Sequence, residues 1–180
     1  MDGLRFAIWL TALAASLPAA TLERLSFEEM TAKSTAIVRG RVTGSYAAAH
    51  GRIIYTHYRV RVSERWKGPV AVELDVVVPG GSAAGLRQSF AGAPKLAEGA
   101  EYVLFLWTGA SRLTHVIGLS QGVFDLQRDA TGALVAMRAA SSEVLLDPAS
   151  GRAVNDQPLR LRLEDLSQRI KSTLARSAAR

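Results

Sequence analysis

The sequence predicts a mostly β domain with a short helix near its beginning and a longer helix at its end. Between residues 36 and 78, apolar and polar side chains alternate in three stretches, which is typical of antiparallel strands with one buried face. Residues 101–107 (EYVLFLW) form a continuous apolar run, as expected for a central strand buried on both faces. The last helix is predicted by four apolar residues at helical spacing, Leu163, Leu166, Ile170 and Leu174.

The first predicted element is a helix that begins after Leu25 and ends near Ser34. Ser26 can cap its first turn, and Glu29, three residues later, completes a capping box. Leu25 can pack against Met30 as a hydrophobic staple, which fixes the direction in which the chain enters the helix.

The predicted strands follow with short connections between them. The first two, at residues 36–46 and 53–66, are joined through a hairpin connection at residues 46–52. In the second strand, Tyr58, Val60 and Val62 are expected to point inward. The outward side chains of that strand are His57, Arg59, Arg61 and Ser63. The remaining strands are expected at residues 72–78, 86–90 (an edge strand in a loose segment), 101–107, 113–117, 123–126 and 134–137.

These elements predict an antiparallel barrel that occupies residues 21–150. A C-terminal segment, residues 151–180, carries a helix at about 163–176 that is packed on the barrel, across its side or its open end. Apolar residues from four strands are expected to fill the interior: Val38, Val42, Val60, Val62, Leu74, Val76, Leu104 and Leu106. The helix is expected to cover the barrel with Leu166, Ile170 and Leu174.

Composition places the chain among globular proteins and excludes cysteine chemistry. The apolar fraction of 48% and the charged fraction of 21% are close to globular averages. The chain has 180 residues, which suffices for one domain with a sizeable core. It contains no Cys, so disulfides, thiolate metal sites and Cys nucleophiles are excluded.

The chain is basic, with a net charge of +6, and Arg provides 18 of its 22 basic residues. A basic surface attracts polyanions such as nucleic acid, anionic lipid or acidic polysaccharide. The chain also has 29 Ala and 15 Gly, a composition that a GC-rich genome produces without any selection for binding. Both interpretations stay open.

Residues 1–20 have the pattern of a secretory signal peptide. Arg5 precedes an apolar run at residues 6–17, and small residues follow it. The run is shorter than the roughly 20 residues that a membrane-spanning helix needs. We expect cleavage after Ala19 or Ala20 and a mature protein that is soluble in the periplasm or secreted; an uncleaved N-terminal anchor is the rival interpretation.

Residues 118–122 (GLSQG) match the G-x-S-x-G motif of serine hydrolases. In that fold the Ser lies on a strand-to-helix turn, and the catalytic Asp and His follow later in the chain. Here residues 123–126 look like another strand, and all three histidines, His50, His57 and His115, precede Ser120. A glycine-flanked bend between strands is the favoured interpretation, although triads of other orders exist on other folds.

No other motif predicts catalysis or a cofactor. Residues 80–85 have the glycine spacing of a phosphate-binding loop, but Leu86 and Arg87 occupy the positions where Lys and Ser or Thr are required, so a merely flexible loop is expected. The histidines lack metal-ligand spacing. We therefore predict no catalytic residue, no bound metal and no cofactor.

One cluster of charged residues is a candidate binding site. If the first two strands pair as a hairpin, five arginines share the outward face with His57 beside them: Arg39, Arg41, Arg59, Arg61 and Arg65. Such an arginine stripe could bind a polyanion. Charged side chains are equally what the solvated face of an antiparallel sheet carries.

The order of these elements resembles netrin-like domains and tissue inhibitors of metalloproteinases, and more closely a group of uncharacterised exported bacterial proteins. The resemblance covers roughly residues 24–127. It depends on a helix and on the segments 36–42 (AIVRGRV), 58–62 (YRVRV), 66–68 (WKG), 80–81 (GG) and 98–106 (EGAEYVLFL). It implies an OB-like five-stranded antiparallel Greek-key barrel. The tissue inhibitors act through an N-terminal Cys, which this chain lacks.

These observations favour an exported, non-enzymatic binding module whose partner is a protein of the envelope or the extracellular space. Two alternatives stay open. The first is a barrel that binds an acidic polymer through the arginine stripe, and the second is a hydrolase whose catalytic residues the sequence pattern does not reveal.

Overall fold

The structure is a computed structural model that describes residues 21–179, and these residues form mainly strands. The helices are α1 (Phe27–Lys33), the short 3-10 helix η1 (Leu119–Gly122) and α2 (Leu163–Ala178). The strands are β1 (Thr21–Glu23), β2 (Ala36–His50), β3 (Ile53–Lys67), β4 (Glu73–Pro79), β5 (Gly81–Ala83), β6 (Leu86–Gln88), β7 (Glu101–Thr108), β8 (Thr114–Val116), β9 (Val123–Arg128), β10 (Leu134–Arg138), β11 (Val144–Leu146), β12 (Ala153–Val154) and β13 (Leu159–Arg162). The predicted mostly β class is confirmed.

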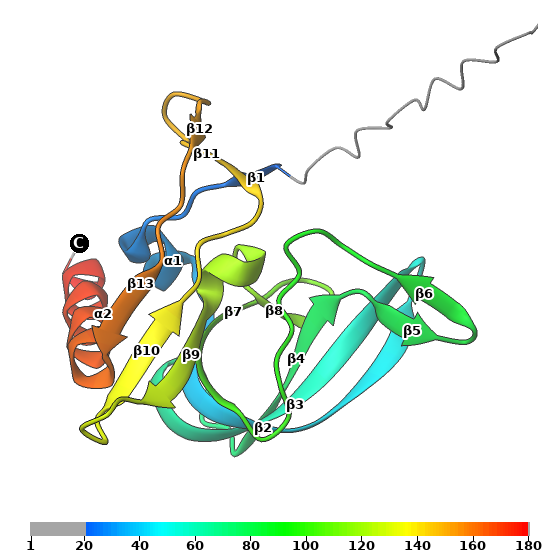
Figure 1. Cartoon of the computed structure of the whole chain (residues 1–180), viewed down its shortest axis with the longest axis horizontal. Helices are drawn as coiled ribbons and strands as arrows, with labels where there is room; N and C mark the ends of the chain where they lie inside the picture. Colours follow the sequence, from blue (N-terminus) through cyan, green and yellow to red (C-terminus); the bar gives the residue numbers. More distant parts are fainter. Residues whose placement is uncertain (1–20, 180) are drawn as a thin grey trace, which may run out of the picture.

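Five strands pair in a closed cycle, which we call the ring (Figure 1). β2 pairs with β3, β3 with β4, β4 with β8, β8 with β7, and β7 with β2. All of these pairs are antiparallel except β4–β8, which is parallel. β7 pairs with β9 along the first part of one edge and with β8 along the last part, so β9, β10 and β13 continue from the ring as an outer sheet.

The hairpin between β2 and β3 is longer and tighter than the sequence predicts. The expected connection at residues 46–52 is wrong, because β2 continues to His50 and only Gly51 and Arg52 form the turn. Gly51 adopts a φ of 62°, a left-handed conformation that suits a two-residue hairpin turn. Tyr46 therefore lies within a strand and faces His57 across the pair.

Irregular pairing bends the same hairpin around the ring. The register of β2 against β3 shifts at three places, one of them between Arg39 and Gly40. A Cβ at Gly40 would lie 2.5 Å from Val60 Cγ1, so this glycine lets the two strands approach closely at the bend. Such bulges increase local twist and curvature.

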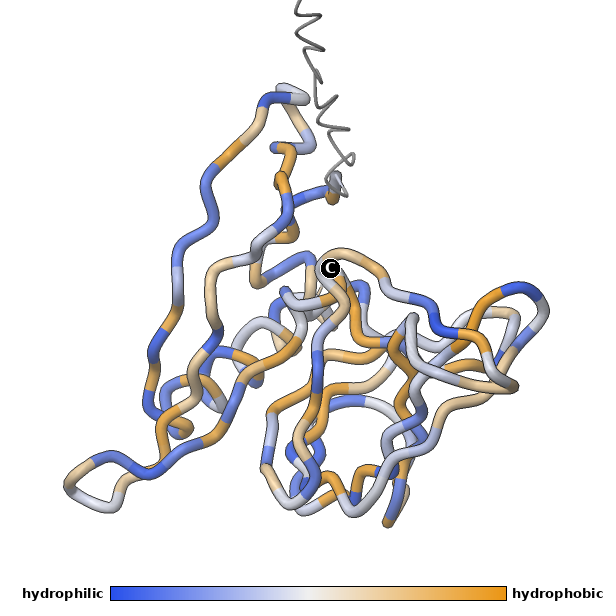
Figure 2. Tube along the Cα trace, turned by 45° about the vertical axis from the view of Figure 1, so that its right-hand side comes forward, coloured by the Kyte–Doolittle hydropathy of each residue, from blue (hydrophilic) through white to orange (hydrophobic). Residues whose placement is uncertain are grey.

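Two apolar cores lie on opposite faces of the sheet. The first fills the ring, and it contains all eight of the residues that the sequence predicts for the interior; Val62 and Leu74 are only partly buried. The second lies between the outer face and the helices, and includes Phe105 and Phe124. β7 contributes to both cores and residues 102–106 are fully buried, which confirms the predicted central strand. In Figure 2 long apolar stretches run through the strands of the molecule.

Both helices lie on the outer face. α1 begins with the predicted capping box: Glu29 N–H donates to Ser26 Oγ at 3.1 Å, and Ser26 N–H donates to a Glu29 carboxylate oxygen at 2.9 Å. α2 packs against α1 and the outer sheet, with Leu166 and Ile170 fully buried. Trp66 Nε1 on β3 donates to Ser167 Oγ on α2 at 2.9 Å, which joins this helix to the ring.

The described residues contain no helix long and apolar enough to cross a membrane. The predicted signal peptide and its cleavage site lie outside the described residues.

Candidate functional site

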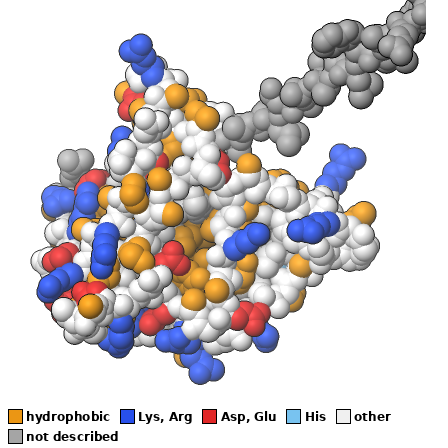
Figure 3. All heavy atoms as spheres, viewed as in Figure 1, with side chains coloured by type: hydrophobic (Ala, Val, Ile, Leu, Met, Phe, Trp, Pro, Cys, Tyr) orange, Lys and Arg blue, Asp and Glu red, His pale blue; other side chains and the backbone are white. Residues whose placement is uncertain are grey.

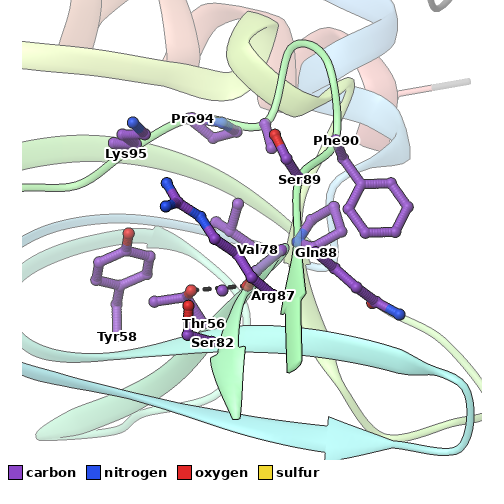
Figure 4. A pocket seen from close by; sticks show the side chains of 14 residues that line it. Thr56, Tyr58, Val78, Ser82, Arg87, Gln88, Ser89, Phe90, Pro94 and Lys95 are labelled. Carbon is purple, nitrogen blue, oxygen red and sulfur yellow. Dashed lines mark hydrogen bonds between the residues drawn. The ribbon is translucent and has the colours of Figure 1, made fainter. Parts of the chain in front are cut away.

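A cavity of about 290 Å³ lies at one end of the ring, where a small hairpin and the loop after it fold over the inner face of β3 and β4 (Figure 4). We call it the mouth cavity. Its floor is formed by Thr56, Tyr58 and Val78. The hairpin β5–β6 and the loop contribute the other labelled residues of the figure, namely Ser82, Arg87, Gln88, Ser89, Phe90, Pro94 and Lys95.

The glycine-rich segment after β4 forms the hairpin over the cavity. The sequence interpretation treats residues 80–85 as a merely flexible loop, and that interpretation is wrong. Gly81 pairs with Gln88, and the strands turn through Ala84 and Gly85, whose φ angles are 50° and 75°. Two consecutive left-handed residues form the tight turn that matches the twist of a hairpin. The hairpin places Arg87 beside the cavity.

Hydrogen bonds of the Gln88 and Thr56 side chains fix this hairpin to the ring. Ile54 N–H donates to Gln88 Oε1 at 2.7 Å, and Gln88 Nε2 donates to the carbonyl oxygen of Arg52 at 2.9 Å. Thr56 Oγ1 donates to the carbonyl oxygen of Gly80 at 2.8 Å. Gln88 thus connects β6 to the start of β3, and Thr56 holds Gly80, the residue that precedes the hairpin.

The loop that follows is anchored beyond the cavity. Leu96 is buried in the ring core. Ala97 N–H donates to the Tyr102 hydroxyl at 2.8 Å, and Gly99 N–H donates to the carbonyl oxygen of Val42 at 2.8 Å. Lys95 lies directly before these anchors, so its backbone is fixed while its side chain is exposed.

The mouth cavity is lined by positive charge without any acidic side chain. Arg87 and Lys95 both line it, and none of its lining residues is Asp or Glu. Within residues 21–179, neither basic side chain forms an ion pair or a hydrogen bond. In Figure 4 both extend toward the space above Tyr58. In Figure 3 the charged side chains visible at the far right, where β5 and β6 lie, are basic, whereas acidic side chains are visible nearer the centre and at the bottom.

Tyr58 supplies a hydroxyl group at the floor of the cavity. Its side chain is 7% exposed, and no hydrogen bond to its hydroxyl occurs in the described part of the chain. Tyr102, a second tyrosine of the ring core, instead has its hydroxyl occupied by Ala97. The Tyr58 hydroxyl oxygen is not among the buried polar atoms that lack a partner in the described residues, so it is accessible from the cavity to a ligand or to water.

The predicted arginine stripe lies elsewhere, on the outer face of β2 and β3, and acidic residues interrupt it. Arg41 faces Arg61 directly, but Arg39 faces Glu64. Glu101 of β7 lies 2.8 Å from Arg39 Nε and 3.5 Å from Arg41 Nη2. Arg59 is exposed on β3, but Arg65 faces the ring-core residue Val38 across the pair, so the register shift takes it off the outward face; Arg65 Nη1 donates to the carbonyl oxygen of Gly68 at 2.7 Å. Polyanion binding by these residues stays a prediction.

The sequence alternation predicts that His57 points outward into solvent. In the structure its ring instead has partners on the outer face. Its ring stacks on Tyr46 with centroids 4.5 Å apart, and Nδ1 lies 2.8 Å from Asp75 Oδ2. The side chain is consequently buried on the outer face. His57 stabilises the pairing of β2, β3 and β4 and does not extend the arginine stripe.

The segment with the G-x-S-x-G pattern forms η1 and leads into β9. Ser120 Oγ lies 3.5 Å from Ser141 Oγ, and no histidine hydrogen-bonds to Ser120 among residues 21–179. Gln121 is the buried polar residue of this turn: its side chain accepts a hydrogen bond from Leu25 N–H at 2.9 Å and donates to the carbonyl oxygen of Glu23 at 3.0 Å. Its contacts attach the N-terminal segment to the turn.

Comparisons with protein-family models, with curated proteins and with solved structures return no match. The resemblance to netrin-like domains and tissue inhibitors therefore stays a prediction, and the chemistry of the mouth cavity carries the functional argument.

Proposed function

We propose that this protein is a non-enzymatic binding module that takes the anionic group of a ligand into the mouth cavity. The single observation that carries the proposal is the lining of that cavity: Arg87, Lys95 and the unpaired Tyr58 hydroxyl converge there without a carboxylate. Basic side chains and a hydroxyl donor are the partners that carboxylate, phosphate and sulfate groups require.

The cavity suits a ligand group rather than a polymer. A volume of about 290 Å³ holds a small anion together with a few adjoining atoms. Arg87 can present two parallel N–H donors to such a group, while Lys95 adds a point charge. The hairpin and the loop are both anchored to the ring, so little conformational entropy has to be lost on binding.

We further propose that the ring is an OB-like five-stranded Greek-key barrel and that the chain is exported. The first proposal is supported by the pairing cycle and by the one parallel pair within it, β4–β8. The second is supported by the signal-peptide pattern of residues 1–20.

Two other functions stay as alternatives with weaker support. A polyanion could bind the arginine stripe, but Glu101 already pairs with two of its members. Within the proposed function itself, the anionic group can belong to a protein of the envelope or the extracellular space, as a terminal carboxylate or a modified side chain. A hydrolase that uses Ser120 is disfavoured because, among residues 21–179, no histidine is hydrogen-bonded to Ser120 to act as its general base.

Calorimetric titration tests the proposal. Inorganic phosphate, sulfate and acetate are titrated into the purified protein at constant ionic strength, with the double variant Arg87→Gln/Lys95→Gln beside it. We expect at least one anion to bind, and the double variant to bind it about 10-fold or more weakly, because two charge-assisted contacts are removed.

The matched control is the double variant Arg61→Gln/Lys171→Gln, which removes the same net charge at two exposed positions outside the cavity. Equal weakening in both double variants would refute a localised site and would favour a general effect of net charge. Weakening in the control alone would move the site to the arginine stripe.

A further inference from the structure

An apolar groove of about 350 Å³ lies next to the mouth cavity, on the outer face of the ring. Its centre is formed by three ring-bearing side chains, Tyr55 of β3, Trp107 of β7 and His115 of β8. The remaining lining residues are apolar or glycine: Leu22, Val77, Val78, Pro79, Pro94, Val116, Gly118 and Leu119. We call it the aromatic groove.

Tyr55 and Trp107 each place an aromatic ring next to the imidazole ring of His115. The rings of Tyr55 and His115 lie 5.6 Å apart at an interplanar angle of 65°, and those of Trp107 and His115 lie 6.2 Å apart at 34°. Trp107 is 46% exposed although it is one of the largest apolar residues of the chain. Its ring lies against Gly109, where a side chain would collide with it. An exposed aromatic surface of this kind marks a binding site more often than a random surface position does.

The groove is electrically neutral, in contrast to the cavity beside it. None of its lining residues is Asp, Glu, Lys or Arg. Burial lowers the pKa of His115 below its ordinary value of 6.5, so the imidazole is mainly neutral at pH 7. The groove therefore favours an uncharged, apolar group.

The two sites are neighbours. Val78, Pro79 and Pro94 line both of them, so they meet where the end of β4 approaches the loop. The charged cavity lies on one side of this contact, and the aromatic groove lies on the other. Because the sites lie on opposite faces of β3 and β4, one ligand can reach both only by passing around the end of β4, over Pro79 and Pro94, which line both sites.

We infer that the ligand is an amphiphilic anion, whose anionic group lies beside Arg87 and Lys95 and whose apolar chain or ring lies against Trp107 and Tyr55. This inference rests on the proposed function for the position of the anionic group. The apolar part is assigned by the neutral lining of the groove and by the residues that it shares with the cavity.

The experiment compares probes that differ in one part at a time. Acetate, decanoate, decanol and decyl phosphate, each below the concentration at which it forms micelles, are titrated into the full chain and into two variants. One variant is Trp107→Ala, and the other is Arg87→Gln/Lys95→Gln. Heat reports binding, and tryptophan fluorescence locates the apolar part: a blue shift in the full chain that disappears in Trp107→Ala comes from Trp107 and not from Trp9 or Trp66.

We expect decanoate or decyl phosphate to bind at least about 100-fold more tightly than acetate, since burial of even a few methylene groups has an effect of this size. Whichever of the two binds more tightly identifies the head group as a carboxylate or a phosphate. Trp107→Ala should weaken binding of that probe about 10-fold and leave acetate unchanged. Arg87→Gln/Lys95→Gln should weaken binding of all three anionic probes and leave binding of decanol unchanged.

The outcomes separate this inference from the proposed function. If acetate and decanoate bind equally and both depend on Arg87 and Lys95, the cavity binds anions but the inference is refuted. If decanol binds as tightly as both anionic amphiphiles and the double variant has no effect, the proposed function is refuted, and with it the assignment of the anionic group. Absence of binding by all four probes would refute both.

Discussion

Two tyrosines of the ring core allow a direct test of which hydroxyl group has a structural role. Tyr58 and Tyr102 are 7% and 3% exposed, and both rings belong to the same apolar core. The Tyr102 hydroxyl accepts a hydrogen bond from Ala97 N–H at 2.8 Å, whereas the Tyr58 hydroxyl has no partner among residues 21–179. Replacement of each tyrosine by Phe removes one oxygen atom and leaves the ring in place.

The expected effects on stability differ in size. Tyr102→Phe leaves the partly buried Ala97 N–H without an acceptor, which should lower the free energy of unfolding by about 1–2 kcal/mol. For a domain of this length, that corresponds to a decrease of roughly 3–6 °C in Tm. Tyr58→Phe removes no hydrogen bond between protein groups, so the free energy of unfolding should change by less than about 0.5 kcal/mol.

Binding should show the opposite order. Loss of the Tyr58 hydroxyl should weaken binding of the preferred anion about 10-fold, because one donor to a charged group is removed. Denaturant unfolding of both variants and calorimetry with the preferred anion measure the two quantities. If Tyr58→Phe lowers stability as much as Tyr102→Phe and does not affect binding, then its hydroxyl has a structural partner and the assignment of the cavity is wrong.

Three further predictions concern the fold around the site. Leu166→Asp places a charge in the fully buried contact of α2 and should lower the free energy of unfolding by more than about 3 kcal/mol, measured by denaturant titration; an unchanged midpoint would show that α2 is not docked. Gln88→Ala should lower the protection of the Ile54 amide against hydrogen exchange while distant amides of β7 keep theirs, because Gln88 is the acceptor for that amide. Burial lowers the pKa of His115, so the unfolded state binds more protons between the folded pKa and 6.5, and stability should fall as the pH falls from 7.5 to 5; His115→Asn should lose part of this slope, and an identical slope in both proteins would contradict the prediction.

The inner and outer faces of the strands could be predicted because they depend on local alternation. The pattern around Val60 places alternate residues in the ring core, and the capping box of α1 spans only four residues. The strands that escaped prediction, β1, β5, β11, β12 and β13, are two to four residues long, which is too short to show an alternation.

The candidate site could not be predicted because its parts are distant in the sequence. Tyr58 belongs to β3, whereas Arg87 and Lys95 belong to a segment that looks like an unstructured, glycine-rich loop. The acidic residue that interrupts the arginine stripe, Glu101, is 62 residues from Arg39 along the chain. A partial signal was nevertheless present: Gly85 suits a turn between two short strands, and Arg87 lies two residues after it, in the second of them.

The position of β7 also has a kinetic consequence. Its edges are used by β2, β8 and β9, so the ring and the outer sheet share one strand. Pairing with β2 joins residues such as Val38 and Leu104, which are far apart along the chain, and the loop between them must close before either sheet is complete. A topology dominated by such non-local pairs folds slowly, on a scale of roughly milliseconds to seconds. During this time the apolar β7 segment is unprotected, which makes it the part of the nascent chain most exposed to aggregation and to capture by chaperones.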